Sequence, residues 1–295
     1  MKICFLLNPT ANSGRCAALA EQIRYWNFPE GVIWTLCETR APREATRRAT
    51  EAALSHDIVV AIGGDGTIRE VAEGLWQAKR GILGIIPAGT GNDLVRTLGW
   101  VPEFVPSMER LFSQKTRFLD AGLADGQFFV NAASIGFDAA VLSLFDRIKK
   151  RIRSKTAYSL ALLEALVRYR DLSVCGAEGK EEKLFLLAVG NGRYYGGGFQ
   201  ILPQACMEDG ALDVCRITNI RRSTVLRLLP SIFSASHGKH ERYVHMARVS
   251  RWTEEIAQPF ALNLDGELFS YAQGKRVEFE VLPRALQIVG EEAKA

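Results

Sequence analysis

The chain has 295 residues, of which 47% are hydrophobic and 24% charged, which is enough for two domains with sizeable cores. No apolar run approaches the roughly 20 residues of a membrane-spanning helix, and the apolar start at 3–7 is too short for a signal peptide, so we expect a cytoplasmic protein. The net charge of +4 does not indicate nucleic-acid binding, and six cysteines without a Cys-x-x-Cys pair argue against zinc or a disulfide framework.

The first 120 residues alternate between strand and helix patterns. Apolar runs rich in β-branched residues predict strands, and amphipathic patterns predict helices between them. We expect strands at 3–7, 32–37, 57–62 and 82–86, and helices at 15–26, 43–54 and 67–76. Because nearly continuous apolar strands that alternate with helices favour a parallel sheet covered on both faces, we predict an N-terminal α/β domain at 1–120.

A glycine-rich turn, Gly-Gly-Asp-Gly-Thr at 63–67, follows directly on the expected strand at 57–62 and opens a helix. Ligands bind at the carboxyl ends of strands in such sheets. Glycines let the backbone approach a phosphate closely, and the amides at the start of a helix favour an anion. Asp65 can hold Mg²⁺ directly or through water. The alternative is a plain turn with Asp65 as helix cap, which is common for one glycine and much less so for this motif.

A second loop repeats this logic with Pro-Ala-Gly-Thr-Gly-Asn-Asp at 87–93. We expect Asn92 or Asp93 to cap a short helix there. The carboxyl ends of parallel strands lie at the same edge of a sheet, so the two loops can face one nucleotide together. The pair is therefore more specific than either loop alone.

Beyond residue 120, short strands and turn residues dominate. We expect strands at 128–131, 184–189, 211–217, 260–264 and 277–282, with helices at 156–169 and 224–234. This pattern predicts a β-rich, antiparallel, sandwich-like second domain at 121–284.

The two glycine loops, in this order, resemble the diacylglycerol kinase catalytic family, which includes bacterial lipid kinases and sphingosine kinases. Further segments match motifs of that family in chain order: Asn8-Pro9, Ser-Ile-Gly-Phe-Asp at 134–138, the stretches 196–203 and 208–213, and Leu-Asp-Gly-Glu at 264–267. The resemblance implies the fold of NAD kinases and diacylglycerol kinases, with the nucleotide bound by the domain at 1–120 and the lipid pocket in the domain at 121–284. It also implies that the last strand, at 285–289, returns to the first domain, so that 285–295 join it.

The resemblance further implies roles for individual residues. Glu267 is expected to be the general base that takes the proton from a lipid hydroxyl, with Asp265 beside it. Asp65 is expected to be the carboxylate of the catalytic Mg²⁺ site, with Asp93 and Asp120 extending an aspartate and water network. The expected contacts to ATP are Asn8, Thr39, Gly63, Gly64, Asp65, Gly66, Thr67, Ile68, Arg69, Glu70 and Thr90.

A second, structural Mg²⁺ is implied at Asp209 and the main-chain carbonyls of Cys206 and Ala211. The residues alone favour another interpretation, in which Asp209 is a turn residue before Gly210. Likewise, Asp265-Gly266 alone predicts a type I′ hairpin turn between two strands.

A basic stretch at 146–155 precedes an apolar pattern at 158–166. This combination suits docking on an anionic membrane surface, and the alternative is a solvated face of a core helix. His237, His240 and His245 fit no zinc pattern, and we expect them at the surface or facing phosphate.

We therefore expect an ATP- and Mg²⁺-dependent lipid kinase of phospholipid biosynthesis, peripheral at the inner face of a bacterial-type membrane. Diacylglycerol, converted to phosphatidic acid, is the first choice of acceptor; phosphatidylglycerol, a sphingoid base and a polyprenol are the others. Two alternatives stay open: an NAD kinase-like or phosphofructokinase-like enzyme, and a catalytically silent regulator that binds nucleotide or lipid. The motifs at 89–93, 208–213 and 264–267 favour the lipid kinase over the first alternative. The presence of Asp65 and Glu267 favours it over the second. A homodimer is compatible with the sequence, but no pattern supports it.

Overall fold

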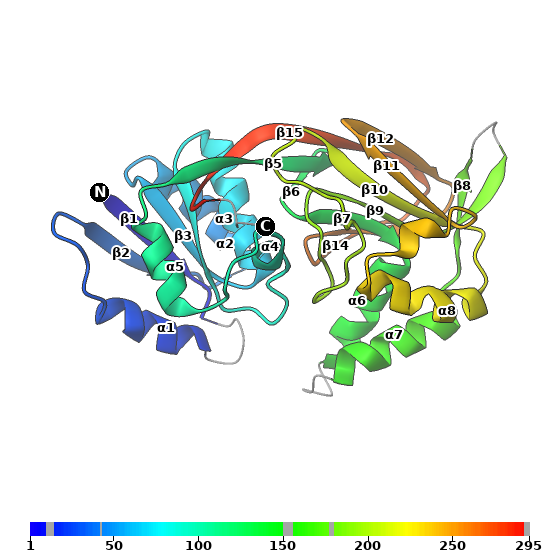
Figure 1. The fold of residues 1–295 in the computed structure, drawn as a ribbon, viewed down its shortest axis with the longest axis horizontal. Coiled ribbons are helices and arrows are strands. Elements are labelled where there is room, and N and C mark those ends of the chain that lie inside the picture. Colours follow the sequence, from blue (N-terminus) through cyan, green and yellow to red (C-terminus); the bar gives the residue numbers. More distant parts are fainter. Residues whose placement is uncertain (10–14, 42, 150–155, 177–179, 292–295) are drawn as a thin grey trace.

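The structure is a computed structural model that describes residues 1–9, 15–41, 43–149, 156–176 and 180–291. Figure 1 shows two lobes that are joined by two long strands running along one side of the molecule. Within the described residues, the strands form one 15-stranded sheet that continues from one lobe into the other.

The N-terminal lobe is a three-layer α/β unit. Its parallel strands lie in the order β2-β1-β3-β4. They are β1 (Lys2–Leu7), β2 (Ile33–Glu38), β3 (Ile58–Gly63) and β4 (Ile82–Pro87), and the helices are α1 (Arg15–Arg24), α2 (Glu44–Ala53), α3 (Asp65–Ala78), α4 (Asp93–Thr97) and α5 (Phe104–Leu111). Side chains alternate along each strand, so Phe5 and Val60 pack with α1 and α5, while Leu6 and Ala61 pack with α2 and α3. The predicted parallel α/β domain is confirmed.

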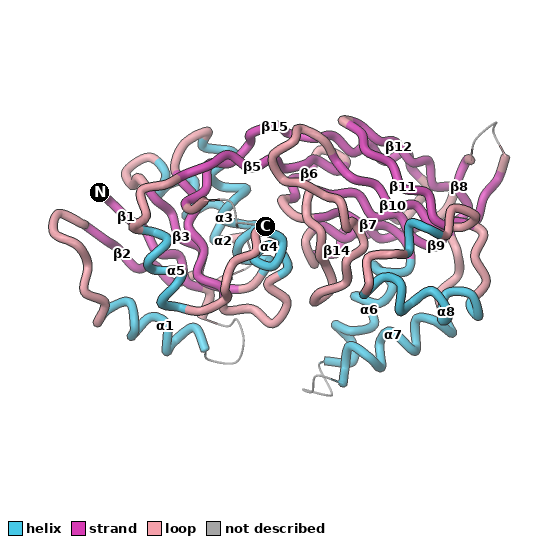
Figure 2. The backbone as a smooth tube through the Cα atoms, in the orientation of Figure 1, coloured by secondary structure: helices cyan, strands magenta, loops and turns pink. Residues whose placement is uncertain are grey.

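The C-terminal lobe is a curved antiparallel sheet with helices on one side, as Figure 2 shows. Its strands are β6 (Gln127–Phe129), β7 (Ala132–Gly136), β8 (Leu172–Cys175), β9 (Glu181–Gly190), β10 (Leu212–Thr218), β11 (Val244–Val249), β12 (Arg251–Ile256), β13 (Phe260–Leu264) and β14 (Glu267–Tyr271). Its helices are α6 (Phe137–Lys149), α7 (Thr156–Arg168), α8 (Arg222–Phe233) and a short 3₁₀ helix, His237–Lys239. One hydrophobic core is formed by side chains of the strands alone, and another lies between the sheet and the three α-helices. Among the helices in the described part of the chain, none has the length and apolar content of a membrane span.

The two lobes share the strands β5 (Thr116–Ala124) and β15 (Lys275–Val289), which pair antiparallel with each other. At one end β15 pairs with β12 of the C-terminal lobe, and at the other it pairs in parallel with β4 of the N-terminal lobe. Its register on β5 shifts between Leu282 and Leu286. One strand from the end of the chain therefore completes both lobes.

Asp120 connects β5 to two distant segments of the chain at this register shift. One carboxylate oxygen accepts a hydrogen bond from the Arg284 amide at 2.7 Å, and the other accepts from the Gly210 amide at 2.7 Å. The side chain is almost completely buried, and Arg284 has a positive φ of 51°. Because both oxygens bind backbone amides of other segments, Asp120 acts here as a structural tie, which differs from the expected role in a metal network.

Several elements were absent from the predicted set. The helices α5 and α6, the 3₁₀ helix at 237–239, and the strands β5, β7, β8, β11, β12 and β14 were not expected. The segments expected at 277–282 and 285–289 are one strand, β15. The helix expected to begin at Thr67 begins at Asp65, directly after Gly64. The predicted type and order of the remaining elements are correct.

We predict that Asp120→Ala lowers the free energy of unfolding by about 2 kcal/mol, because each of two partly buried amides loses its acceptor at about 1 kcal/mol. Urea unfolding followed by circular dichroism measures this. Asp57→Ala is the matched control, since Asp57 also accepts one backbone amide, from Lys2 at 2.7 Å, but is exposed. Equal losses for the two variants would contradict a special role for Asp120.

Candidate functional site

The two glycine loops touch each other backbone to backbone. A Cβ atom added at Gly89 would lie 2.6 Å from the Cα of Gly64, and one added at Gly63 would lie 2.4 Å from Oγ1 of Thr67. The amide of Ala88 donates to the carbonyl of Gly63 at 2.7 Å, which continues the pairing of β3 and β4. Side chains at these positions would separate the loops, so the glycines are required for the close approach.

Two acidic side chains converge beside this contact. A Cβ atom at Gly91 would lie 2.9 Å from Oδ2 of Asp65 and 3.5 Å from Oδ2 of Asp93. Burial raises the pKa of Asp65, although backbone amides such as that of Leu94 oppose the shift. Burial and the neighbouring Asp65 raise the pKa of Asp93 to about 6. The two carboxylates therefore form a buried, mutually repelling pair.

This pair fits a divalent cation. Oδ1 of Asp93 is buried and has no hydrogen-bond partner among the described residues. Mg²⁺ prefers oxygen ligands and is often held by one or two carboxylates together with substrate phosphates. The described residues contain no group of three or more metal-binding side chains.

The predicted nucleotide contacts fall into two groups, and the first surrounds the loops. Asn8, at the end of β1, donates to Oγ1 of Thr67 at 3.3 Å. Gly66 has open space at its Cβ position, and Thr90 is exposed. The hydroxyl of Thr39 donates to the carbonyl of Leu7 at 3.3 Å at the ends of β2 and β1. These positions lie at the carboxyl edge of the parallel strands.

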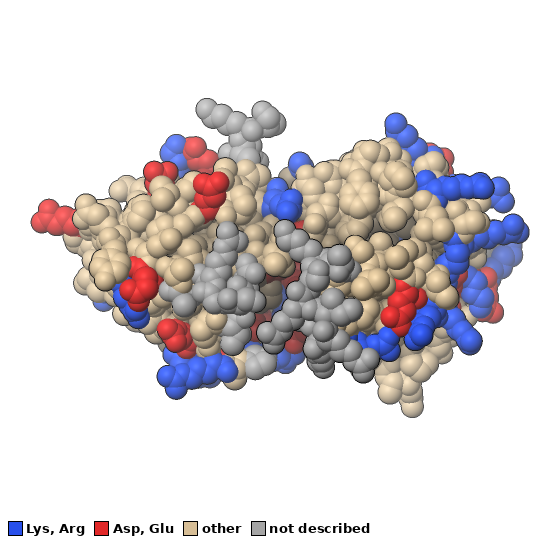
Figure 3. Space-filling view, turned by 90° about the horizontal axis from the view of Figure 1, so that it is seen from below, with Lys and Arg blue, Asp and Glu red and all other residues tan. Residues whose placement is uncertain are grey.

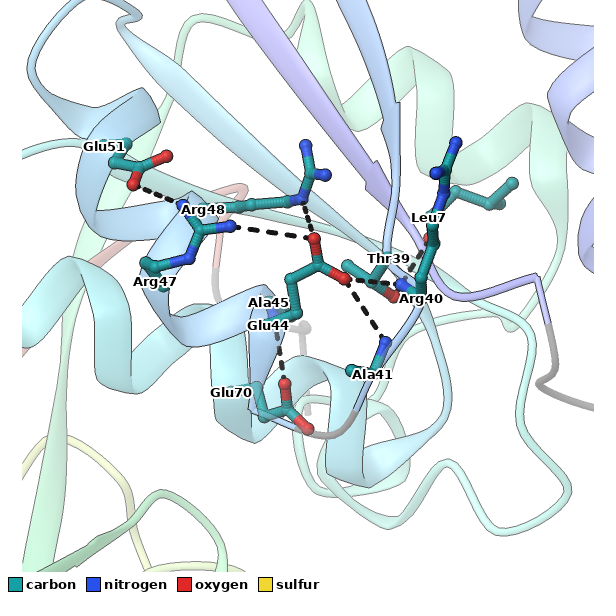
Figure 4. Close-up of polar contacts among 10 residues, drawn as sticks. All are labelled: Leu7, Thr39, Arg40, Ala41, Glu44, Ala45, Arg47, Arg48, Glu51 and Glu70. Atoms are coloured by element: carbon teal, nitrogen blue, oxygen red, sulfur yellow. Dashed lines mark hydrogen bonds and ion pairs between the residues drawn. The ribbon is translucent and has the colours of Figure 1, made fainter.

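The side chains of the second group are engaged with other parts of the protein. Ile68 is buried in the core. Glu70 accepts a hydrogen bond from the amide of Ala45 at 3.1 Å and so holds the first turn of α2, as Figure 4 shows. In the same view, Glu44 accepts from the amide of Arg40 at 2.6 Å. These contacts fix the loop that precedes α2.

Arg69 points toward the C-terminal lobe. Its side chain is only 5% exposed and forms an ion pair with Glu267 and a longer one, at 3.6 Å, with Glu73. Arg43 approaches the other carboxylate oxygen of Glu267 at 3.9 Å. Arg69 lies one helical turn after Asp65 on α3, so the ion pair brings the predicted base next to the helix that carries the predicted metal ligand. The sequence offers no signal for this pairing.

Asp265 is buried below Glu267 and binds the backbone. Its carboxylate accepts hydrogen bonds from the amides of Val130 at 2.7 Å, Asn131 at 3.0 Å and Ala132 at 2.9 Å. Burial raises its pKa, and these amides oppose the shift. With positive φ at both Asp265 and Gly266, the segment is the hairpin turn between β13 and β14. Asp265 therefore positions the turn that presents Glu267.

At the predicted structural metal site, Asp209 has protein partners. One oxygen accepts from the amide of Ala211 at 3.0 Å, as in a turn, and the other pairs with Arg248. Burial, followed by the nearby Asp209, raises the pKa of Asp213 to about 6. Arg248 therefore supplies a positive charge to Asp209.

The C-terminal lobe, in which a lipid pocket was expected, contains an apolar cavity whose lining residues the sequence did not reveal. It lies between the sheet and the helices α6, α7 and α8 and measures about 80 Å³. The polar groups on its wall are Asp138, Tyr158, Tyr195 and His237. The expectation that His237 lies at the surface is wrong, because it is buried and its Nε2 lies 2.9 Å from the carbonyl of Ile201.

Asp138 sits at the polar end of this cavity. The Ser134 hydroxyl donates to its Oδ2, as does Nδ2 of Asn263 at 2.7 Å. Burial raises the pKa of Asp138, while these two donors oppose the shift. The motif at 134–138 contained this residue, but only the fold shows that it faces a cavity.

A short loop connects the cavity to the carboxylate pair. Tyr195 and Phe199 pair through their backbones and both line the cavity. At the tip between them, the Gly197 amide donates to Oδ2 of Asp93 at 2.9 Å. The phosphate loop of one lobe and the cavity of the other are thus separated by a single loop.

The structure describes only part of the predicted basic stretch. Arg147, near the end of α6, pairs with Glu164 of α7. Residues 150–155 lie outside the described residues.

Comparisons with known proteins agree on one family. Residues 2–124 match the model of the diacylglycerol kinase catalytic domain, and residues 131–290 match that of the YegS C-terminal NAD kinase beta sandwich-like domain. A Pseudomonas aeruginosa protein named probable lipid kinase YegS-like is 34% identical over 82% of this chain and 80% of its own length. A Bacillus subtilis protein named diacylglycerol kinase is 30% identical over 87% of this chain and 86% of its own length.

Solved structures show the same fold. A crystal structure of a diacylglycerol kinase from Bacillus anthracis matches 98% of this chain and 97% of that chain, with a TM-score of 0.68 at 22% identity. Another crystal structure from the same organism matches 98% and 95%, with a TM-score of 0.78 at 24% identity.

We predict that Mg²⁺ stabilises the protein, by about 3 °C in melting temperature at tenfold excess over its dissociation constant. Because a carboxyl must be deprotonated to bind metal, the shift should weaken as the pH falls through about 6, the pKa of Asp93. Asp93→Asn should remove most of the shift, and Asp57→Asn, a distant exposed carboxylate, should keep it. Differential scanning fluorimetry measures this; an unchanged shift in Asp93→Asn would refute the site.

Proposed function

The chain belongs to the diacylglycerol kinase catalytic family, and we propose that it transfers the γ-phosphate of ATP to the hydroxyl of a membrane lipid, with Mg²⁺ as the metal. Diacylglycerol, giving phosphatidic acid, is the proposed acceptor. We further propose a domain boundary near residue 120, with 285–290 completing the first domain through the pairing of β15 with β4.

The observation that carries this proposal is the short loop that links the apolar cavity to the carboxylate pair. Tyr195 and Phe199 line the cavity, and Gly197, between them, is bound to Asp93. A lipid with its apolar part in the cavity would therefore have its polar end near the carboxylate pair. A dinucleotide acceptor would need polar partners, whereas most side chains on the cavity wall are aliphatic or aromatic, which supports a lipid.

In the proposed reaction, the glycine loops hold the phosphates of ATP through backbone amides, and Asp65 and Asp93 hold the metal. Mg²⁺ would neutralise charge on the transferred phosphoryl group. Glu267 takes the proton of the lipid hydroxyl as the oxygen–phosphorus bond forms and the bond from the γ-phosphorus to the bridging oxygen breaks, releasing ADP. Arg69 holds Glu267 at the interface between the lobes. No covalent enzyme intermediate is required.

We propose that the enzyme works at the cytoplasmic face of a membrane. Its phosphoryl donor is dissolved in the cytosol, while its acceptor lies in a bilayer. The two substrates meet only at that surface.

We predict that Glu267→Gln lowers kcat by about 10²- to 10⁴-fold, the usual contribution of a general base. The measurement is phosphate transfer from labelled ATP to diacylglycerol in mixed micelles. Gln keeps the size of the side chain and an oxygen for Arg69, so the KM for ATP should change little. Asp65→Asn should also abolish transfer, through loss of the metal ligand.

Glu255→Gln is the control, because Glu255 is an exposed carboxylate of the same lobe. It should act like the unmodified enzyme. If Glu267→Gln retains full activity, the assignment of the base is wrong. If the unmodified enzyme labels no lipid, the proposed function is wrong.

We predict that filling the cavity discriminates between acceptors by chain length. Val225→Phe places a larger side chain in the cavity wall and should lower kcat/KM for a long-chain lipid by about tenfold, a binding loss of about 1.4 kcal/mol. Kinetics with a short-chain diacylglycerol should change less, and the KM for ATP should stay the same. Val225→Ala, which enlarges the cavity, is the matched variant. Equal losses with both chain lengths would place the acyl chain elsewhere.

A further inference from the structure

The helix α7 buries small side chains and exposes large apolar ones, which is the reverse of the usual pattern. Its buried side chains include the small Ala157, Ala161 and Ala165, each with less than 2% of its surface exposed. Its large apolar side chains Leu160, Leu163 and Val167 are 43%, 58% and 86% exposed. The spacing of these three along the helix places them on one face. A surface helix in a water-soluble domain normally presents polar residues there.

The neighbouring helix α8 shows the same feature. Leu226 and Phe233, two turns apart, are 55% and 59% exposed. Val225 is the one buried residue of α8, all of whose residues the structure describes. The helix is therefore only lightly held by the core beneath it.

The two exposed stripes lie on the same side of the molecule. Both helices cover the apolar cavity, because Tyr158 and Leu162 of α7 and Leu228 of α8 line it. Figure 1 shows α7 and α8 next to each other, on the side of the sheet away from β15. Of the twelve large apolar side chains that are more than a third exposed in the described ranges, five belong to these two helices. Such clustering distinguishes them from the single exposed apolar residues found on most proteins.

Basic residues border this apolar face. Arg168, Arg170, Arg221 and Arg227, at the ends of the helices and on α8, are exposed. The sequence of the two helices contains one acidic residue, Glu164, which pairs with Arg168 at 3.0 Å and with Arg147. In Figure 3, which views the molecule from below, Lys and Arg gather toward the outer edge of this lobe. The face is thus apolar in its middle and positively charged at its border.

We propose that the exposed face of α7 and α8, with Leu160, Leu163, Val167, Leu226 and Phe233 at its centre, docks on an anionic lipid bilayer. The apolar side chains enter the boundary between headgroups and acyl chains, and the arginines bind the anionic headgroups. The cavity lies directly under this face, so an acyl chain passes from the bilayer into the protein without crossing water. This inference rests on the proposed lipid kinase function.

The charge pattern favours a bilayer over a second copy of this chain. The basic border would face itself across a symmetric dimer, and like charges in contact oppose association. An anionic surface complements both the apolar centre and the border.

The experiment measures flotation of the full-length protein with vesicles of phosphatidylglycerol and phosphatidylcholine. The docking variant combines Leu163→Ser, Val167→Ser and Leu226→Ser, none of which lines the cavity. Its matched control combines Ile33→Ser and Leu54→Ser, which are 60% and 67% exposed on the N-terminal lobe. The docking variant should bind the vesicles at least about tenfold more weakly, and the control should bind as the unmodified protein does. Equal binding by all three would overturn the proposal.

A second variant tests the charged border. Arg168→Gln with Arg227→Gln should weaken binding to vesicles that contain phosphatidylglycerol and leave binding to pure phosphatidylcholine unchanged. Arg251→Gln, on β12, is the control. Loss of self-association in the docking variant, measured by sedimentation velocity, with vesicle binding unchanged, would assign the face to a dimer and refute the proposal.

Activity separates this inference from the proposed function. The docking variant should phosphorylate a short-chain diacylglycerol below its critical micelle concentration as fast as the unmodified enzyme, and long-chain diacylglycerol in vesicles more slowly. If the unmodified enzyme phosphorylates neither lipid, the proposed function fails. If the docking variant matches it on vesicles, only the docking surface fails.

Discussion

Two loops can share one phosphate chain only if nothing stands between their backbones, and in this protein that condition depends on the contact of Gly64 with Gly89. The contact brings the start of α3 next to the start of α4, and so brings together the carboxylates of Asp65 and Asp93. Asp93 then reaches Gly197 in the other lobe. The cavity, the carboxylate pair and the loop amides therefore hold fixed positions relative to each other because two glycines lack side chains.

The sequence predicted those parts of the fold whose pattern is local. Strands buried on both faces and the glycine turns after them have unambiguous signals, and they were confirmed. Elements with buried charges escaped prediction. Asp120 interrupts the apolar pattern of β5, yet its carboxylate is satisfied by two amides from distant segments. Glu254 likewise places a charge in β12, where it is buried and forms an ion pair with Arg216. No local sequence pattern predicts that a charged residue will have hydrogen-bond or ion-pair partners in distant segments.

The candidate site was predictable to a similar degree. Spacing and resemblance indicated Asp65 and Glu267, whose roles stay predictions. The contacts of the neighbouring side chains could not be predicted from the sequence, because their partners come from other helices and strands. Arg69, expected at the nucleotide, pairs with Glu267, and Asp265, expected beside the reaction, binds three backbone amides; their expected roles also stay predictions. The apolar cavity is formed by residues from the helices and strands of the C-terminal lobe, and its sequence signals were the motif that contains Asp138 and the stretch 196–203.

The strand β15 has a consequence for how the protein is made. Domains usually fold one after another as the ribosome releases them, the N-terminal domain first. Here Leu286 and Ile288 belong to the core beneath α2 and α3, and Val289 to the core beneath α1. The N-terminal lobe therefore lacks part of its core, and β5 lacks its long partner, until residues 275–289 leave the exit tunnel. Neither lobe reaches its final stability before that segment has been synthesised, so chaperones have a long interval in which to bind the nascent chain.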